Sequence, residues 1–116
     1  MCIRDSFNIG RASMLVAALT RGNERYLRLG LDDALHQPYR AELIPGMYDV
    51  FKAARRAGAA GATLSGAGPC LIAYVLERRH AEEAVGKAML EAFRKHDVEA
   101  RILTLDLDTH GAQILK

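Results

Sequence analysis

Apolar residues in the first half of the chain recur three and four positions apart, the spacing of one face of an α-helix. This spacing predicts helices over residues 8–21, 24–31 and 47–57, with Gly22 and Gly58 marking two of the ends. The apolar face expected for the first of these helices consists of Ile9, Ala12, Leu15, Val16 and Leu19. The face expected for the third consists of Met47, Val50, Phe51, Ala54 and Ala57. Two prolines interrupt residues 32–46, which are expected to form a loop or a broken helix.

The pattern changes after Gly58. Short apolar runs bounded by glycine and proline predict strands over residues 62–65 and 70–76, and the second run is apolar on both faces, as expected of a central strand. A regular helical stripe follows over residues 80–96. Residues 98–107 alternate imperfectly and predict a last strand with a bulge near Ile102, followed by a short closing segment at 111–115.

This order of elements favours an α+β fold. A helix that connects two strands beside a tight strand pair is typical of a ferredoxin-like two-layer sandwich, in which the helices cover one face of the sheet. We therefore expect a ferredoxin-like sandwich, without internal repeats.

Composition narrows the range of functions. The chain has 116 residues, of which 50% are hydrophobic and 26% charged, and its net charge is +2. That length supports one domain and excludes a large multidomain enzyme. The balanced charge, the 6% of aromatic residues and the lack of tryptophan argue against nucleic acid as a partner. The longest apolar run, residues 71–76, is too short to span a bilayer, so no membrane association is expected.

The cysteines and histidines predict neither a disulfide framework nor a metal site. Cys2 and Cys70 lie far apart, and the four histidines are scattered without the spacing of metal ligands. Reduced thiols are typical of cytoplasmic proteins, which is the location we expect.

Residues 61–70 (Gly-Ala-Thr-Leu-Ser-Gly-Ala-Gly-Pro-Cys) are the most informative segment. Three glycines and a proline within ten residues indicate backbone conformations that side chains disfavour. Successive N–H groups in such a turn can converge on a phosphate or a carboxylate, although a plain hairpin connection accounts for the same residues equally well. The segment is neither a Walker A loop, because no Gly-Lys-Ser/Thr follows, nor a dinucleotide fingerprint.

This segment resembles the third conserved motif of the GHMP kinase superfamily, in the form that homoserine kinases carry. Residues 35–40 (Leu-His-Gln-Pro-Tyr-Arg), 43–46 (Leu-Ile-Pro-Gly) and 10–19 (Gly-Arg-Ala-Ser-Met-Leu-Val-Ala-Ala-Leu) are similar to further segments of that family. The resemblance extends from Phe7 to about Leu115, and it implies that residues 7–116 form the C-terminal domain of a GHMP kinase.

The resemblance implies ATP-dependent phosphorylation of the hydroxyl group of L-homoserine on the route to threonine, with Mg²⁺ required. It further implies that Arg11 and Arg40 bind the substrate carboxylate, a group that a planar guanidinium holds with two hydrogen bonds. The glycine loop of Ser65, Gly66, Ala67 and Gly68 would lie near the transferred phosphate or shape the cleft beside it. No residue of this chain is assigned a catalytic role, and homodimers are common in the family.

The sequence departs from the family in two respects. The family's phosphate-binding loop (Pro-x-x-x-Gly-Leu-Gly-Ser-Ser-Ala) and the acidic residue that would hold Mg²⁺ have no counterpart here. We therefore expect a truncated enzyme that lacks its N-terminal half and does not phosphorylate homoserine on its own. Residues 1–6 resemble no part of the family and have no periodic relation to the helix expected from residue 8, which predicts a non-native extension.

Two other functions are compatible with parts of this pattern. A stand-alone ferredoxin-like module that binds an amino acid and regulates a partner enzyme would fit the order of elements, but it has no need for both the glycine loop and Arg40. A GHMP kinase that acts on mevalonate or a sugar would explain the glycine loop, but residues 36–40 argue against it.

Overall fold

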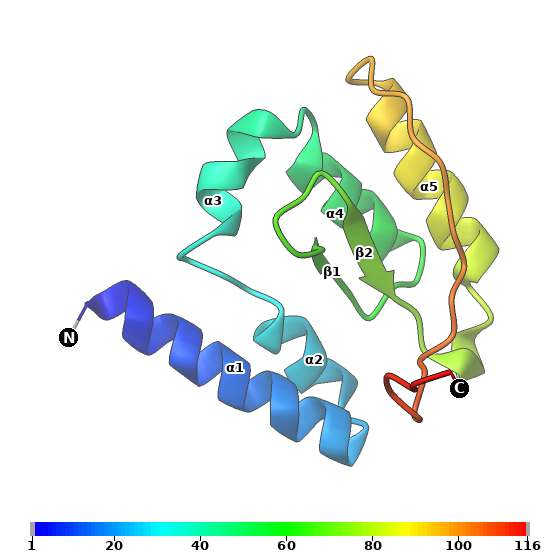
Figure 1. Cartoon of the computed structure of the whole chain (residues 1–116). Helices are drawn as coiled ribbons and strands as arrows, with labels where there is room; N and C mark the ends of the chain where they lie inside the picture. Colours follow the sequence, from blue (N-terminus) through cyan, green and yellow to red (C-terminus); the bar gives the residue numbers. More distant parts are fainter. Residues whose placement is uncertain (1, 116) are drawn as a thin grey trace.

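In the computed structural model, which describes residues 2–115, the chain begins with a pair of packed helices. These are α1 (Ile3–Arg21) and α2 (Glu24–Gly30), joined by a two-residue turn (Figure 1). Gly22 ends α1 in the left-handed conformation, at a φ of 64°. The Asn23 side chain then accepts a hydrogen bond from the backbone N–H of Tyr26 at 3.1 Å and caps α2. The predicted boundary between the two helices is confirmed.

The segment interrupted by proline is a broken helix, as expected. It contains α3 (Gln37–Arg40) followed by the 3₁₀ turn η1 (Ala41–Leu43). Asp33 lies ahead of α3 and accepts hydrogen bonds from the backbone N–H groups of Leu35, His36 and Gln37. These bonds satisfy donors that a short helix leaves unpaired at its start.

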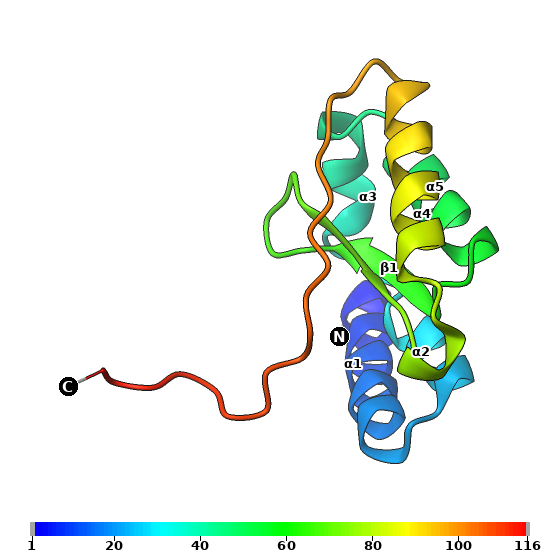
Figure 2. The same ribbon diagram turned by 90° about the vertical axis from the view of Figure 1, so that its right-hand side faces the viewer.

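The second half of the chain packs two helices against one β-hairpin. Strands β1 (Gly61–Leu64) and β2 (Leu71–Tyr74) pair antiparallel, with Leu64 opposite Leu71. Helix α4 (Met47–Arg56) precedes the hairpin, and the 3₁₀ turn η2 (Glu77–Arg79) and helix α5 (Glu82–Arg94) follow it. Figure 2 shows α4 and α5 together on one side of the hairpin. The predicted α+β class is confirmed.

The main core lies between α4, α5 and the hairpin. Four of the five side chains expected on the α4 face are buried in this core, and the fifth, Ala57, is partly buried. The core consists of Ile44, Met47, Val50, Phe51, Ala54, Ala59, Ala62, Leu64, Val85, Ala92 and Phe93. A smaller cluster of Ala18, Leu27 and Ala60 joins the first two helices to the hairpin.

The prediction of a strand over residues 98–107 is wrong. Within residues 2–115 the sheet has two strands, and residues 98–107 form no regular structure. Val98 packs against the main core and Ile102 contacts Gly86 of α5, so this part of the chain lies along a helix rather than beside a strand. Beyond Ile102 the leucines are exposed, and the chain leaves the body of the molecule (Figure 2). Since no residue from 2 to 115 pairs with its second edge, β2 is not the central strand that was expected.

Helix α1 differs from the prediction at its start and in its buried face. It begins at Ile3 rather than residue 8, and Met1 lies outside the described residues. Ile9, Val16 and Leu19, expected on the buried face, are exposed, whereas Leu15 and Ala18 face the rest of the chain. The helix therefore has one packed face and one uncovered apolar face. That residues 1–6 are a non-native extension stays a prediction.

No helix within residues 2–115 combines the length and the apolar character that crossing a membrane requires.

Replacing Gly30 with alanine is expected to lower the free energy of unfolding by about 1–3 kcal/mol, because the α1–α2 contact has no room for a methyl group. An ideal Cβ on Gly30 would lie 2.7 Å from the Leu15 backbone nitrogen and 2.8 Å from its Cα. Gly10→Ala is the matched control, since nothing lies within 4 Å of its Cβ position. That change should stabilise α1 by about 0.5–1 kcal/mol. Urea denaturation followed by circular dichroism measures both, and equal effects would contradict the close contact.

Candidate functional site

The glycine-rich segment is the loop of the β1–β2 hairpin. The Ser65 backbone N–H donates to the Cys70 carbonyl at 2.8 Å and extends the ladder by one step, and the Gly68 N–H donates to the Ser65 carbonyl at 3.2 Å. Gly66 and Gly68 have φ angles of 57° and 87°, in the left-handed region that favours glycine. The hairpin interpretation of this segment is therefore confirmed.

The loop leaves backbone donors unused. Gly66 and Ala67 are exposed, and within residues 2–115 their N–H groups donate no hydrogen bond. The Ser65 hydroxyl, beside them, also makes no hydrogen bond to the described residues. Two consecutive free N–H groups and a hydroxyl at the tip of a turn are the donors that a phosphate or carboxylate oxygen requires. The geometry thus allows the anion-binding interpretation as well as the hairpin.

The loop packs against the segment that follows α3. An ideal Cβ on Gly68 would lie 3.1 Å from the Leu64 Cδ1 and 3.2 Å from the Ile44 Cδ1, so these two side chains support the loop from beneath. Ile44 is buried in the main core together with Leu64. The two segments that carry most of the family resemblance, residues 35–46 and 61–70, are therefore in direct contact.

A second set of contacts joins α1 to α3. The Asn8 side chain donates to the Asp33 carboxylate, and its oxygen accepts from the Ala34 N–H at 2.9 Å. One turn earlier, the Arg4 guanidinium donates to the Tyr39 hydroxyl. Partial burial raises the pKa of Asp33, but the hydrogen bonds from Asn8 and from three backbone N–H groups outweigh it and hold the pKa below its usual value. Asp33 is therefore an anion that fixes the start of α3 relative to α1.

The two arginines expected to bind a carboxylate lie on these joined helices. Arg40 is the last residue of α3 and is half-buried, and its side chain makes no hydrogen bond or ion pair with any residue that the structure describes. Arg11 is half-buried on α1, and its guanidinium lies over the Phe7 ring, 4.4 Å from the centroid. The hydrogen bond between Arg4 and Tyr39 links their helices, but among the described residues no hydrogen bond or ion pair joins either arginine to the glycine loop.

Three positioning residues escaped the sequence analysis: Asn8, Asp33 and Ile44. An Asp five positions before Pro38 is a recognisable signal for the start of a short helix, because Asp readily accepts bonds from the following N–H groups. Asn8 and Ile44 act through contacts with residues 25 and 24 positions away in the sequence, and no local pattern marks them.

No group of three His, Cys, Asp or Glu side chains is gathered within residues 2–115 in an arrangement that would hold a metal ion.

Comparison with known proteins gives consistent results. Residues 15–95 match the family model for the C-terminal domain of GHMP kinases. The chain is 45% identical over 105 residues to homoserine kinase of Carboxydothermus hydrogenoformans, a match that covers 90% of this chain and 33% of the relative. It is 44% identical over 109 residues to homoserine kinase of Moorella thermoacetica, covering 94% of this chain and 36% of the relative.

A solved structure shares the fold as well. The crystal structure of homoserine kinase from Cytophaga hutchinsonii superposes with a TM-score of 0.71 at 32% identity, over 82% of this chain and 30% of that one. The chain thus spans about a third of the length of the relatives that it matches. The family match covers most of the chain and the relatives agree with it, so this protein belongs to the GHMP kinase family, of which it carries the C-terminal domain.

Proposed function

We propose that this chain is the C-terminal part of a homoserine kinase, which transfers the γ-phosphoryl group of ATP to the hydroxyl of L-homoserine and forms O-phospho-L-homoserine. The observation that carries the proposal is the similarity to homoserine kinases, which reaches 44–45% identity over at least 90% of the chain. With that activity, we assign the protein to threonine biosynthesis in the cytoplasm.

We propose that the glycine loop binds a phosphate oxygen. Phosphoryl transfer depends on positioning the reactants and on stabilising charge on the phosphate oxygens. The free N–H groups of Gly66 and Ala67 supply fixed dipoles without adding a side chain to the site. The support of Gly68 by Leu64 and Ile44 holds these donors in place, which reduces the reorganisation needed when the phosphate binds.

We propose that Arg40, assisted by Arg11, binds the homoserine carboxylate. Arg40 is available because no described residue pairs with its guanidinium. The contact between Ile44 and Gly68 holds the segment after Arg40 against the glycine loop. An amino acid held by its carboxylate near Arg40 would therefore have its hydroxyl end free to point toward a phosphate at the loop.

The described residues fit only part of a nucleotide site. The loop donors suit one phosphate group, but the described residues contain no carboxylate cluster suited to Mg²⁺. We propose that the remaining ATP and Mg²⁺ contacts come from the portion of the enzyme that corresponds to the part of the relatives outside their match to this chain.

The uncovered face of α1 suits that same portion. Ile9, Val16 and Leu19 are exposed apolar side chains on one side of the helix, and burying them would be favourable. We propose that this N-terminal portion is the partner that covers them. Homodimer formation is a separate proposal, which light scattering of the assembled enzyme tests.

A chimera tests the proposed activity. Joining this chain to the preceding two thirds of the Carboxydothermus hydrogenoformans enzyme is expected to give ATP-dependent phosphorylation of L-homoserine. A coupled assay that detects ADP measures this turnover. The 116-residue chain alone is expected to give no turnover above background, because its described residues hold neither Mg²⁺ nor most of a nucleotide.

Two outcomes would contradict the proposal. Turnover by the isolated chain would show that the additional portion is unnecessary. A folded chimera that phosphorylates mevalonate or a sugar in preference to homoserine would assign the domain to another GHMP kinase.

A further inference from the structure

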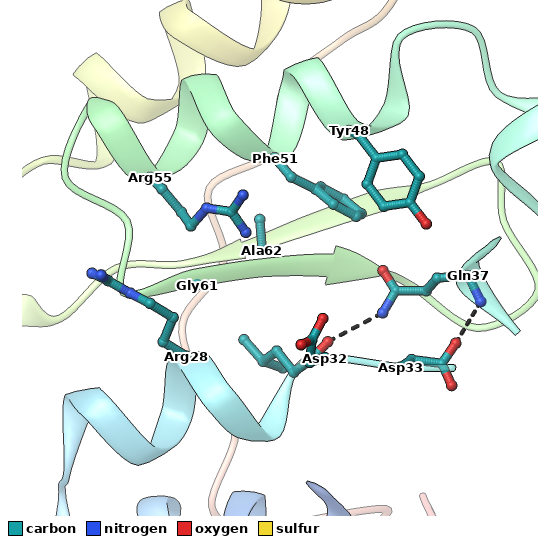
Figure 3. Close-up of a pocket in the computed structure, with 10 residues that line it drawn as sticks. Arg28, Asp32, Asp33, Gln37, Tyr48, Phe51, Arg55, Gly61 and Ala62 are labelled. Carbon is teal, nitrogen blue, oxygen red and sulfur yellow. Dashed lines mark hydrogen bonds between the residues drawn. The ribbon is translucent and has the colours of Figure 1, made fainter. Parts of the chain in front are cut away.

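A cavity separate from the glycine loop lies between α2, the turn that follows it, α4 and β1 (Figure 3). Its volume is about 150 Å³, which is the size of cavity that holds one small organic molecule. Neither Arg11, Arg40 nor any loop residue from 65 to 70 lines it. The substrate site proposed above therefore does not account for this cavity.

Four charged residues line the cavity, and two of them already have partners, since Arg28 donates to the Ala60 carbonyl and Asp33 accepts from Asn8 and three backbone N–H groups. The other two, Arg55 and Asp32, carry opposite charges and do not pair with each other. Arg55 extends from α4 toward β1, and Asp32 rises from the turn after α2 (Figure 3). Neither side chain forms a hydrogen bond or an ion pair with any part of the chain from residue 2 to 115. A cation and an anion are thus both available to a ligand at the same opening.

A buried amide contributes a third polar group. Gln37 is only 8% exposed, and its Nε2 donates to the Leu31 carbonyl at 3.1 Å. No described residue donates a hydrogen bond to its Oε1. Every fully buried side-chain oxygen among the described residues has a hydrogen-bond partner, so this Oε1 is not fully buried. The Oε1 is therefore accessible, and Figure 3 shows the amide turned into the cavity, with the Tyr48 hydroxyl nearby. The burial of the rest of the side chain holds this acceptor in place, and its accessibility leaves it available to a polar ligand.

One part of the wall is apolar. Phe51 and Ala62 are 3% and 5% exposed, and Leu31 fills the space in which a Cβ on Gly61 would lie. A small uncharged side chain would contact these groups.

We propose that this cavity binds a small α-amino acid in its zwitterionic form. Arg55 pairs with the carboxylate, Asp32 with the ammonium group, and a short side chain lies against Phe51 and Ala62, with the Gln37 Oε1 accepting a hydrogen bond from the ammonium or from a side-chain hydroxyl. Because Arg55 and Asp32 cancel in charge, a zwitterion matches both, while a simple anion or cation leaves one of them unpaired. This site does not depend on the proposed kinase function.

Ligand-observed NMR on the 116-residue chain tests the proposal with three related probes. L-serine carries both charges, 3-hydroxypropionate lacks the ammonium group, and 2-aminoethanol lacks the carboxylate. We expect L-serine to bind at least tenfold more tightly than either of the other two. Arg55→Gln and Asp32→Asn should each weaken L-serine binding at least tenfold, because each removes the partner of one charge.

Arg56→Gln is the matched control, since Arg56 is an exposed neighbour on α4 that does not line the cavity. It should leave L-serine binding unchanged, and circular dichroism of each variant verifies that the fold is intact. Absence of L-serine binding would overturn the proposal. So would equal binding of 3-hydroxypropionate, which indicates a simple anion site, or equal loss in Arg56→Gln, which indicates a general surface-charge effect.

Discussion

The free energy of unfolding is expected to fall by about 3–5 kcal/mol when Phe51 is replaced by alanine. Phe51 is 3% exposed and belongs to the core that joins α4, α5 and the hairpin. Its removal leaves a cavity lined by side chains that rigid neighbouring elements hold apart. A domain of this size is stable by about 5–15 kcal/mol, so the variant should lose a large share of its stability.

Tyr48→Ala is the comparison for this variant. Tyr48 lies on the same helix and contacts the Phe51 ring edge-on, with 6.0 Å between centroids, but it is 46% exposed. The change should cost about 0.5–1.5 kcal/mol, the size of one aromatic pair. Urea denaturation followed by circular dichroism measures both variants. Similar losses in the two would contradict the placement of the core beneath α4.

The elements that the sequence predicted well are those whose pattern is set within the element. Met47, Val50, Phe51 and Ala54 lie on one face of α4 because helical geometry alone places them there. The turn at Gly22 and Asn23 is equally local, since a left-handed glycine and a side-chain cap need only their immediate neighbours.

The errors occur where the outcome depends on a distant partner. Residues 98–107 alternate enough to suggest a strand, but a strand exists only when a second one supplies its hydrogen bonds, and the described chain offers none to this segment. For α1, the apolar residues form two faces, and the packing of α2, which brings Gly30 against Leu15 and Leu27 against Ala18, decides which face is covered.

In the candidate site, too, the local conformations could be predicted from the sequence and the contacts between distant residues could not. The conformations at Gly66 and Gly68 could be anticipated from composition, because a turn this rich in glycine has few alternatives. The contact of Ile44 with Gly68 and that of Asn8 with Asp33 could not, because each joins residues more than twenty positions apart. These contacts determine how the segments that carry Arg11 and Arg40 lie relative to the loop.

Arg40→Gln in the chimeric enzyme is expected to reduce kcat/KM for L-homoserine by about 30-fold or more, which corresponds to about 2 kcal/mol. The proposed pairing with the substrate carboxylate uses two parallel hydrogen bonds between charged groups, and glutamine retains neither the charge nor the fork. Because the Arg40 side chain makes no hydrogen bond or ion pair with residues 2–115, its replacement should not unfold the domain. Steady-state kinetics with homoserine varied at saturating ATP measures the effect.

The distribution of this loss between substrates distinguishes carboxylate binding from a general defect. The KM for homoserine should rise while the KM for ATP stays the same, because the proposed contact involves the amino-acid substrate alone. Arg40→Lys keeps the charge without the two-pronged geometry. Its kcat/KM for homoserine should therefore lie between that of the unaltered chimera and that of Arg40→Gln. Arg56→Gln, which removes an exposed charge elsewhere on the domain, should be indistinguishable from the unaltered chimera. An unchanged KM for homoserine in Arg40→Gln would remove Arg40 from the substrate site and leave Arg11 as the remaining candidate for the carboxylate.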